Sequence, residues 1–212
     1  MDIVLIFPHQ LFEKNKLLGK NSTVYMIEHE VFFTQYNYHK LKLILHRSTM
    51  KYIEFKDKLE KTFKNLKNKE IHFYDPVDHL VMDNIKKLSK KYNIEMNIHY
   101  TPMFLSNLKD LKKYSEGKDA FIHNNFYKWQ RKRFDILMTN NCKPKGGKWT
   151  YDAQNRKPFP KNFDKNYIPK ENNNKFVKDA IKYIEKYFKD NPGDTEFYLP
   201  IDHKGAKNHF NN

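Results

Sequence analysis

The fold is decided by residues 70–100, which read EIHFYDPVDHLVMDNIKKLSKKYNIEMNIHY. Glu70–Asp75 and Glu95–Tyr100 are short runs rich in isoleucine and aromatic residues, and both are predicted strands. Between them, apolar side chains recur every three or four residues, which predicts a helix over His79–Tyr92. A strand, a helix and a second strand at this spacing indicate a right-handed βαβ unit with parallel strands.

The residues upstream extend the same alternation. Asp2–Phe7 and Thr23–Glu28 are predicted strands, and apolar residues at helical spacing predict a long helix over Tyr38–Phe63. The fold class is therefore α/β, with an open parallel sheet flanked by helices. Ligands of such sheets bind at the carboxyl ends of the strands. The segments expected at that edge are Phe7–Phe12, Glu28–Tyr38, Asp75–Asp78 and Thr101–Ser106.

The chain after the sheet reads as a helix, an irregular stretch and a further helix. These are Phe121–Met138, Thr139–Asn174 and the amphipathic segment Phe176–Phe188. An irregular stretch of this length is normally either functional or a linker that wraps another domain. We therefore predict two parts, an α/β domain over residues 1–138 and a loop with a helix over residues 139–212.

The composition favours a folded protein without a membrane span. The chain has 212 residues, of which 39% are hydrophobic and 16% aromatic, enough to bury a core. No apolar run approaches the roughly 20 residues of a membrane span, and no secretory signal is visible. We expect a protein that is not secreted: cytoplasmic, or nuclear or in a viral factory if the source is not bacterial. The single cysteine, Cys142, excludes a disulfide framework and an all-cysteine metal site within this sequence.

The positive charge is concentrated in one segment. The chain carries 40 basic and 25 acidic residues, a formal net charge of +15, and residues 121–175 hold 13 Lys and Arg against 4 Asp and Glu. A solvated lysine-rich surface accounts for much of this charge. A basic segment with interleaved aromatic residues also suits a polyanionic partner such as nucleic acid. The candidate contacts are Arg131, Lys132, Arg133 and Lys148.

Several short motifs fit ordinary structural roles better than catalytic ones. Residues 145–148 resemble a phosphate loop only faintly, because Trp149 stands where that motif needs Ser or Thr. Asp75 and Asp78 suit a turn followed by a helix cap better than an acid pair. Cys142 has no activating neighbour in the sequence, and the ten histidines show no metal-binding spacing. We predict no catalytic and no metal-ligating residue in this chain.

The irregular stretch contains residues whose types suit docking. Aromatic side chains and an arginine capable of bidentate contacts, standing in a loop without predicted secondary structure, usually bind a partner. The residues of this kind are Trp149, Asp152, Asn155 and Arg156.

Four motifs share their pattern with one known family. Residues 7–11 read FPHQL, similar to a strand-1 G-D-Q-L loop, and residues 39–51 read HKLKLILHRSTMK, similar to HKQK…LHRASMK. Residues 126–133 read FYKWQRKR, similar to FYxxxRRK, and residues 146–157 read GGKWTYDAQNRK, similar to GGKWxFDxENRK. On these motifs the sequence resembles the photolyase/cryptochrome-related proteins of the bacterial iron–sulfur branch, which includes the prokaryotic (6-4) photolyases. The last motif is long and specific, and the resemblance covers nearly the whole chain.

For residues 1–138 the resemblance implies a Rossmann-like or flavodoxin-like antenna domain that binds a ribityl-lumazine chromophore. Carried over by motif position, the pocket residues are His9, Gln10, Glu28 and Lys40. The sequence departs from the family at two positions, because His9 stands where the strand-1 loop has Asp and Phe32 stands where an acid is usual. The polar anchors of a lumazine ring would therefore differ here.

For residues 139–212 the resemblance implies an interdomain linker loop, a helix and the start of a helical FAD domain. In the family that helical domain holds FAD, a [4Fe–4S] cluster on four cysteines and the lesion pocket. An electron from the excited flavin repairs a flipped-out pyrimidine dimer. Trp149, Asp152, Asn155 and Arg156 would dock against it.

These expectations describe the N-terminal part of a split or truncated light-dependent DNA-repair lyase. With one cysteine and no helical half, the sequence is expected to be inactive alone and to need an FAD-binding half on a separate polypeptide. Whether this chain is itself an enzyme is left open. The alternative is a basic nucleic-acid-binding protein that has lost photochemistry. A small nucleotide-binding enzyme on the same fold has no supporting motif.

Overall fold

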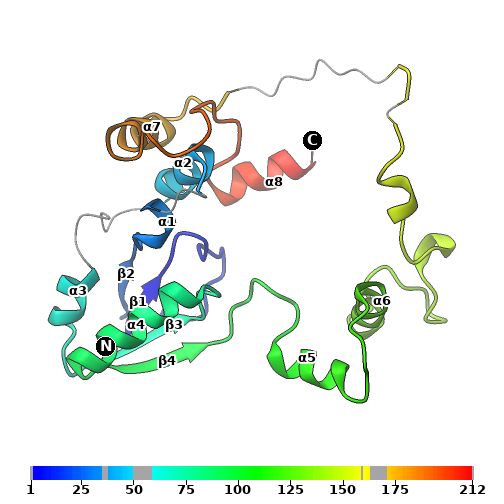
Figure 1. Ribbon diagram of the computed structural model, residues 1–212, viewed down its shortest axis with the longest axis horizontal. Helices are drawn as coiled ribbons and strands as arrows, with labels where there is room; N and C mark the ends of the chain where they lie inside the picture. Colours follow the sequence, from blue (N-terminus) through cyan, green and yellow to red (C-terminus); the bar gives the residue numbers. More distant parts are fainter. Residues whose placement is uncertain (1, 35–37, 50–58, 159, 163–170, 212) are drawn as a thin grey trace. The chain divides into compact units, whose positions relative to one another are not determined.

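The computed structural model describes residues 2–34, 38–49, 59–158, 160–162 and 171–211. These residues form a parallel sheet in the order β2-β1-β3-β4 (Figure 1). Its strands are β1 Ile3–Ile6, β2 Thr23–Met26, β3 Glu70–Tyr74 and β4 Glu95–His99. Each lies inside a strand predicted from the sequence. The α/β fold class is therefore confirmed.

The central strand β1 pairs with β2 on one side and β3 on the other, with Ile3 opposite Thr23 and Ile71. Strand β3 in turn pairs with β4. Because all the strands are parallel, their carboxyl ends share one edge of the sheet. The loops that follow β1, β2 and β3 therefore start side by side, although they are far apart in the sequence.

Helices connect and follow the strands. They are α1 Val31–Thr34, α2 Lys40–Thr49, α3 Leu59–Asn65, α4 His79–Tyr92, α5 Leu108–Ser115, α6 His123–Arg133, α7 Lys175–Tyr187 and α8 His203–Asn211, with the 3-10 turns η1 Lys145–Gly147 and η2 Asp152–Gln154.

Helix α4 has the predicted bounds because both of its ends are capped. Asp78 accepts a hydrogen bond from the backbone N–H of Val81 at 3.0 Å, and Asn93 ends the helix in the left-handed region. The carboxylate of Asp75 accepts from the backbone N–H of Val77 at 2.8 Å, which closes a turn. The turn-and-cap interpretation of these two aspartates is confirmed.

Two predicted helices differ from the structure. The helix expected over Tyr38–Phe63 corresponds to α2 and α3, and residues 50–58 of that prediction lie outside the described residues. The helix expected over Phe121–Met138 ends at Arg133, so its last turn was wrong. Asp135 and Leu137 have positive φ values of 52° and 51°, and an α-helix cannot continue through that conformation.

The main hydrophobic cluster lies on one face of the sheet. Ile3, Leu5, Ile71 and Phe73 pack with the apolar side of α4 and with residues of α2 and α7, including Leu43 and Ile184. Helix α7 lies alongside α2 (Figure 1), and so more than 120 residues of chain separate two neighbouring elements of this core. Helix α7 thus helps to bury the region that follows β2.

The chain forms two compact units. Unit 1 comprises residues 1–103 and 169–212, with the sheet and α7, and unit 2 comprises residues 104–168, with α5 and α6. The division after residue 138 that the sequence predicts follows the domains of the family, and compactness alone does not test it.

Unit 2 is built on an aromatic cluster. The Tyr114 ring lies 5.3 Å from Phe121, 5.1 Å from Phe126 and 5.1 Å from Trp129. Asn107 and Asp110 form a capping box at the start of α5. Contacts of this kind hold α5 against α6 within the unit.

Candidate functional site

The loops after β1 and β3 meet at the carboxyl edge of the sheet. His9 Nε2 lies 2.9 Å from the carbonyl oxygen of Pro76. The side-chain amide of Gln10 donates to the carbonyl oxygens of Asp75, at 2.7 Å, and Tyr74, at 3.3 Å. The structure therefore brings these two predicted pocket residues together, both bonded to the backbone that follows β3.

Glu28 lies at the same edge but is held within the protein. Its carboxylate side chain has no exposed area and contacts an Arg47 guanidinium nitrogen at 2.5 Å. The Tyr183 hydroxyl donates to the other carboxylate oxygen at 3.4 Å, and the Arg47 guanidinium lies 4.2 Å from the centre of the Tyr183 ring. This group joins the end of β2 to α2 and α7, so Glu28 has a structural role whatever else it contacts.

Lys40 begins α2, and its backbone N–H donates to the Pro192 carbonyl oxygen at 2.8 Å. The lysine of α2 whose charge acts on His9 is Lys42, which lies 4.0 Å from the centre of the Tyr38 ring. Lys42 was not predicted as a pocket residue, because the prediction followed the family motif and chose Lys40.

Three imidazoles surround the Phe32 ring. The ring centres of His9, His46 and His29 lie 5.1, 5.9 and 6.3 Å from that of Phe32. The Tyr38 ring lies 6.0 Å from it. We call these three histidines with Phe32 the histidine cluster. Its members come from the ends of β1 and β2, from α1 and from α2.

Burial keeps the cluster neutral at neutral pH. Burial lowers the pKa of His46 to about 4, with the positive charge of Lys42 and the nearby His9 adding to the effect. Burial also lowers the pKa of His9 and of His29, although Asp78 acts in the opposite direction on both. His29 and His46 were not among the predicted pocket residues, because their burial depends on packing between distant segments.

Unit 2 holds the residues predicted to dock a partner or nucleic acid. Lys132, Lys148, Asp152, Asn155 and Arg156 are exposed. The side-chain amide of Asn155, the residue after the turn η2, donates to the Asp152 carboxylate at 3.4 Å. The exposed members are free to reach a second molecule.

Arg131 is different, because it is buried. Its guanidinium donates to the carbonyl oxygens of Ile136 at 3.1 Å, Leu137 at 2.5 Å and Trp149 at 3.0 Å. It also lies 5.5 Å from the centre of the Trp149 ring. The hydrogen bonds of Arg131 therefore connect the loop after α6 to the motif at residues 146–157.

Arg133 is paired with Asp110 at 2.6 Å and lies 5.2 Å from the Trp129 ring and 4.7 Å from the Phe134 ring. Lys132 lies 5.4 Å from the centre of the Trp149 ring. The basic segment is thus interleaved with aromatic rings, as the sequence suggested.

Large apolar side chains of unit 2 are more than half exposed. They are Phe104, Leu105, Leu108, Phe121, Ile122, Leu137 and Tyr151. Single exposed apolar residues are ordinary, but so many in a small unit are less common.

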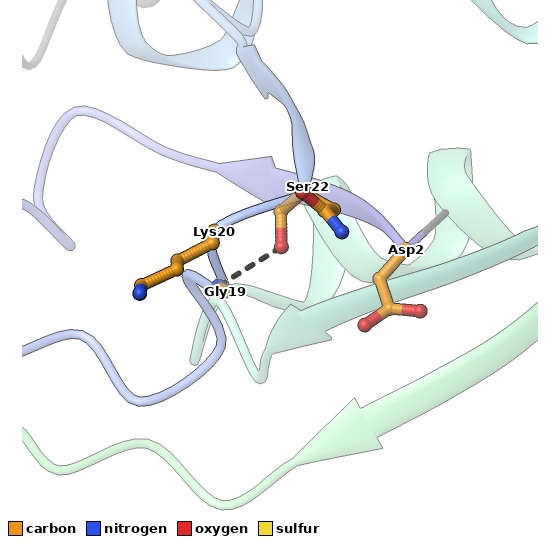
Figure 2. Close-up of a pocket in the computed structure, with 5 residues that line it drawn as sticks. Asp2, Gly19, Lys20 and Ser22 are labelled. Atoms are coloured by element: carbon orange, nitrogen blue, oxygen red, sulfur yellow. Dashed lines mark hydrogen bonds between the residues drawn. The ribbon is translucent and has the colours of Figure 1, made fainter.

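A hollow at the opposite edge of the sheet is lined by none of the predicted site residues. It is lined by Asp2 and by residues 19–22, which precede β1 and β2. Figure 2 shows the backbone N–H of Gly19 donating to the Ser22 hydroxyl, at 2.9 Å, in the turn that forms one side. It lies at the amino ends of the strands, away from the histidine cluster.

Among the described residues, no three His, Cys, Asp or Glu side chains are grouped so that they could hold a metal ion. Cys142 is exposed, as expected for a plain thiol. In the part of the chain that the structure describes, no helix is long and apolar enough to cross a membrane.

These features define a class: an α/β protein with a buried polar cluster at the carboxyl edge of a parallel sheet and a second unit with an exposed basic and apolar surface. The profile of the deoxyribodipyrimidine photo-lyase-related proteins matches residues 4–55 and 51–198, and the chain belongs to this family. The family indicated by the sequence motifs is therefore confirmed.

Two relatives differ greatly in length. The chain is 33% identical to the uncharacterized protein R852 of Acanthamoeba polyphaga mimivirus, over 75% of this chain and 95% of that protein. It is 25% identical to the (6-4) photolyase of Agrobacterium fabrum, over 67% of this chain and 28% of that protein. The aligned part therefore spans under a third of the photolyase and nearly all of the viral protein.

Proposed function

We propose that the chain is the α/β antenna part of a light-dependent DNA-repair lyase and works with a helical FAD-binding half on a separate polypeptide. The observation that carries the proposal is the match to the photolyase-related family over residues 4–55 and 51–198. The photochemistry of the family needs a flavin and an iron–sulfur cluster on four cysteines, and this sequence contains one cysteine. We therefore expect these 212 residues alone to be inactive in repair.

The surface of unit 2 suits such a partner. The motif at residues 146–157 includes Asp152, Asn155 and Arg156 on an exposed turn, and apolar side chains of the same unit are exposed. Arginine and aspartate can form bidentate and charge-assisted contacts at an interface whose centre is apolar. The proposed partner binds there.

Complex formation tests this proposal. The chain is co-expressed with the helical FAD-binding half of the Agrobacterium (6-4) photolyase, and the purified mixture is analysed by size-exclusion chromatography. We expect a yellow one-to-one complex that is weakened at least tenfold by Arg156→Ala and unaffected by Lys64→Ala, a change of a basic residue in unit 1. Failure of the two polypeptides to associate would contradict the proposal.

The antenna role rests on the carboxyl edge of the sheet. His9 and Gln10 are fixed by backbone carbonyls, and each has one buried polar atom without a hydrogen-bond partner among the described residues. These groups fit a heteroaromatic ring that has hydrogen-bonding atoms on its edge, whereas Glu28 is already bound to Arg47. A bound ribityl-lumazine would supply light absorption and pass the excitation to the flavin of the partner half.

A second candidate function is nucleic-acid binding without photochemistry. It is favoured by the positive charge of residues 121–175 and by two exposed lysines. Lys148 lies within the motif at residues 146–157, and Lys132 lies near the Trp149 ring of that motif. Binding of the chain alone to duplex DNA, measured by fluorescence anisotropy between 50 and 200 mM salt, separates the two. A steep loss of affinity with salt supports this second function. The absence of binding at all salt concentrations removes it.

A further inference from the structure

Strand β4 is the outermost strand on one side of the sheet (Figure 1). Among the described residues, β3 is the one strand that pairs with it. The backbone N–H of Glu95 bonds at 3.0 Å to the residue before β3, and the carbonyl oxygen of His99 bonds at 2.9 Å to the residue after β3. Successive residues of a strand direct their backbone groups to opposite sides, so Met96 and Ile98 direct theirs away from β3.

The sequence of β4 has none of the residues that usually protect an outer strand. Such a strand is a template for pairing with another chain, and proteins normally block it with lysine or proline. Strand β4 reads EMNIH, and no Lys or Arg stands between residues 93 and 108, although the chain contains 40 of them. The composition of β4 therefore favours pairing with a further strand.

Strand β4 is complementary to a second copy of itself. When two copies run antiparallel with Asn97 at the centre, Glu95 of each lies opposite His99 of the other. Met96 of each then lies opposite Ile98 of the other, and these are the residues whose backbone groups point away from β3. They can exchange both of their backbone hydrogen bonds. A register shifted by two residues in either direction no longer places Glu95 opposite His99.

The polar side chains of β4 are accessible for this pairing. Glu95 is exposed, and His99 is half-buried. His99 contacts His72 through Nε2, at 3.4 Å. An imidazole N–H can donate to a carboxylate, and residues of opposite charge in directly opposed positions stabilise a pair of strands. Glu95 and His99 would therefore form one such pair at each end of the joined strands.

The apolar side chains of β4 also suit a second copy. Ile98 is in register with Phe73 on the face of the sheet that carries the main hydrophobic cluster, but it is 44% exposed. Met96 packs against that cluster. Met96 of a second copy, placed opposite Ile98, would continue the apolar face from one chain to the other.

The other outer strand lacks this complementarity. Strand β2 reads TVYM and contains no charged residue that could set a register with a second copy. The self-complementary pattern of charge and apolar residues therefore distinguishes β4 from β2.

We propose that two copies of the chain associate through their β4 strands, antiparallel and related by a two-fold axis at Asn97, so that the two sheets become continuous. An interface of this kind uses the same surface on both copies and closes after two. It lies in unit 1 and does not depend on the proposed function, whose partner contacts unit 2. Because the paired strands are short, the dimer is weak and forms at micromolar concentrations.

The test measures the mass of the full chain alone by analytical ultracentrifugation. The chain is studied over a range of micromolar concentrations at physiological ionic strength, which screens its net positive charge. We expect a reversible equilibrium between one and two chains. A single chain at every concentration would overturn the proposal, and so would open-ended association into larger species.

Charge exchange tests the register. Glu95→Lys places a cation opposite His99 and is expected to weaken the dimer at least tenfold, and His99→Glu places two carboxylates opposite each other with a similar loss. The double variant with both changes restores an opposite-charge pair and should regain most of the affinity. Circular dichroism confirms that each variant is folded. A double variant that stays as weak as Glu95→Lys would overturn the register.

A pair of matched variants locates the interface. Ile98→Lys places a charge on the face joined by the two strands and is expected to weaken the dimer at least tenfold. Leu108→Lys is the control, because Leu108 is 77% exposed and belongs to unit 2. It should leave the dimer unchanged. An equal loss in both variants, or a loss in Leu108→Lys alone, would overturn the proposal.

Hydrogen exchange supplies a readout on the backbone itself. The amides of Met96 and Ile98 should exchange slowly at concentrations where the dimer forms and faster on dilution, because pairing with a second strand protects them. Exchange of these two amides that does not change with concentration would contradict the proposal. Since the chain is studied alone, none of these results depends on whether the helical half binds.

Discussion

Functional residues were predicted both at the carboxyl edge of the sheet and on the surface of unit 2. The two regions are built in opposite ways. At the sheet edge, Glu28 and Gln10 are buried, and their contacts are supplied by distant parts of the chain. In unit 2, Asp152 and Arg156 are exposed on a short turn. The comparison teaches that contacts within the fold already hold the polar groups of the first region, whereas those of the second region are exposed.

The largest expected effect comes from breaking the buried pair at the sheet edge. Arg47→Met removes the guanidinium that contacts the buried Glu28 carboxylate, and breaking a buried ion pair costs about 3–5 kcal/mol. Chemical denaturation would measure the loss in the free energy of unfolding. The matched change in unit 2, Arg156→Met, is expected to cost less than about 0.5 kcal/mol because that residue is exposed. Equal losses in the two variants would contradict the comparison.

Acid should also act mainly on the sheet edge. The pKa of His46 is lowered by burial to about 4 in the folded protein, so below pH 6.5 the unfolded chain binds a proton that the folded chain does not. Stability is therefore full above about pH 6.5 and is lost as the pH falls toward 4. The loss from this residue is about 3 kcal/mol, since each unit of pKa shift is worth about 1.4 kcal/mol.

The check is the pH dependence of chemical denaturation in His46→Leu. This variant should lose less stability between pH 6.5 and pH 4.5 than the unchanged chain does. The lowered pKa values of His9 and His29 act in the same direction and remain in the variant. An identical pH dependence in both proteins would show that His46 is not buried as a neutral ring.

Within unit 2, changes to the buried Arg131 and to its exposed neighbour Lys132 should have different effects on stability. Arg131→Met removes a donor from the carbonyl oxygens of Ile136, Leu137 and Trp149, although Leu137 still accepts from the backbone N–H of Lys145, and the expected cost is about 2 kcal/mol. Lys132→Met should have almost no effect on stability. Hydrogen exchange of residues 134–151 would detect local loosening in the first variant. If Lys132→Met loosens this segment as much, the structural role of Arg131 is wrong.

The smallest effect is expected at the helix cap. Asp78→Ala removes the acceptor for the Val81 N–H and should cost about 1 kcal/mol in thermal or chemical denaturation. Asp78→Asn keeps the acceptor and should recover most of that loss. A cost in the Asn variant as large as in the Ala variant would show that the charge near the histidine cluster matters more than the cap.

The sequence was sufficient for features that depend on neighbouring residues. The strands and α4 follow from local periodicity, and the role of Asp78 follows from its position before an apolar helix. The family follows from motifs that are contiguous in the sequence, above all residues 146–157. Local patterns of this kind need no knowledge of tertiary packing.

What the sequence missed depends on contacts between distant residues. Tyr183 reaches Glu28 only because α7 packs on α2, and no local pattern indicates that pairing. Arg131 resembles its exposed neighbours in the sequence, but carbonyl groups of a following loop bury it. The end of α6 was predicted too late because the apolar residues through Met138 suggested a longer helix. Asp135 and Leu137 have positive φ values, which the sequence pattern does not indicate.

The central claim is tested most directly by light-driven repair of ultraviolet-irradiated DNA. The chain is assayed alone, and together with a helical half that carries FAD and the iron–sulfur cluster, under blue light and in the dark. The account predicts no repair by the chain alone, and repair by the pair in the light that exceeds repair by the helical half alone. Light-dependent repair by the chain without a partner, or no gain when it is added, would contradict the account.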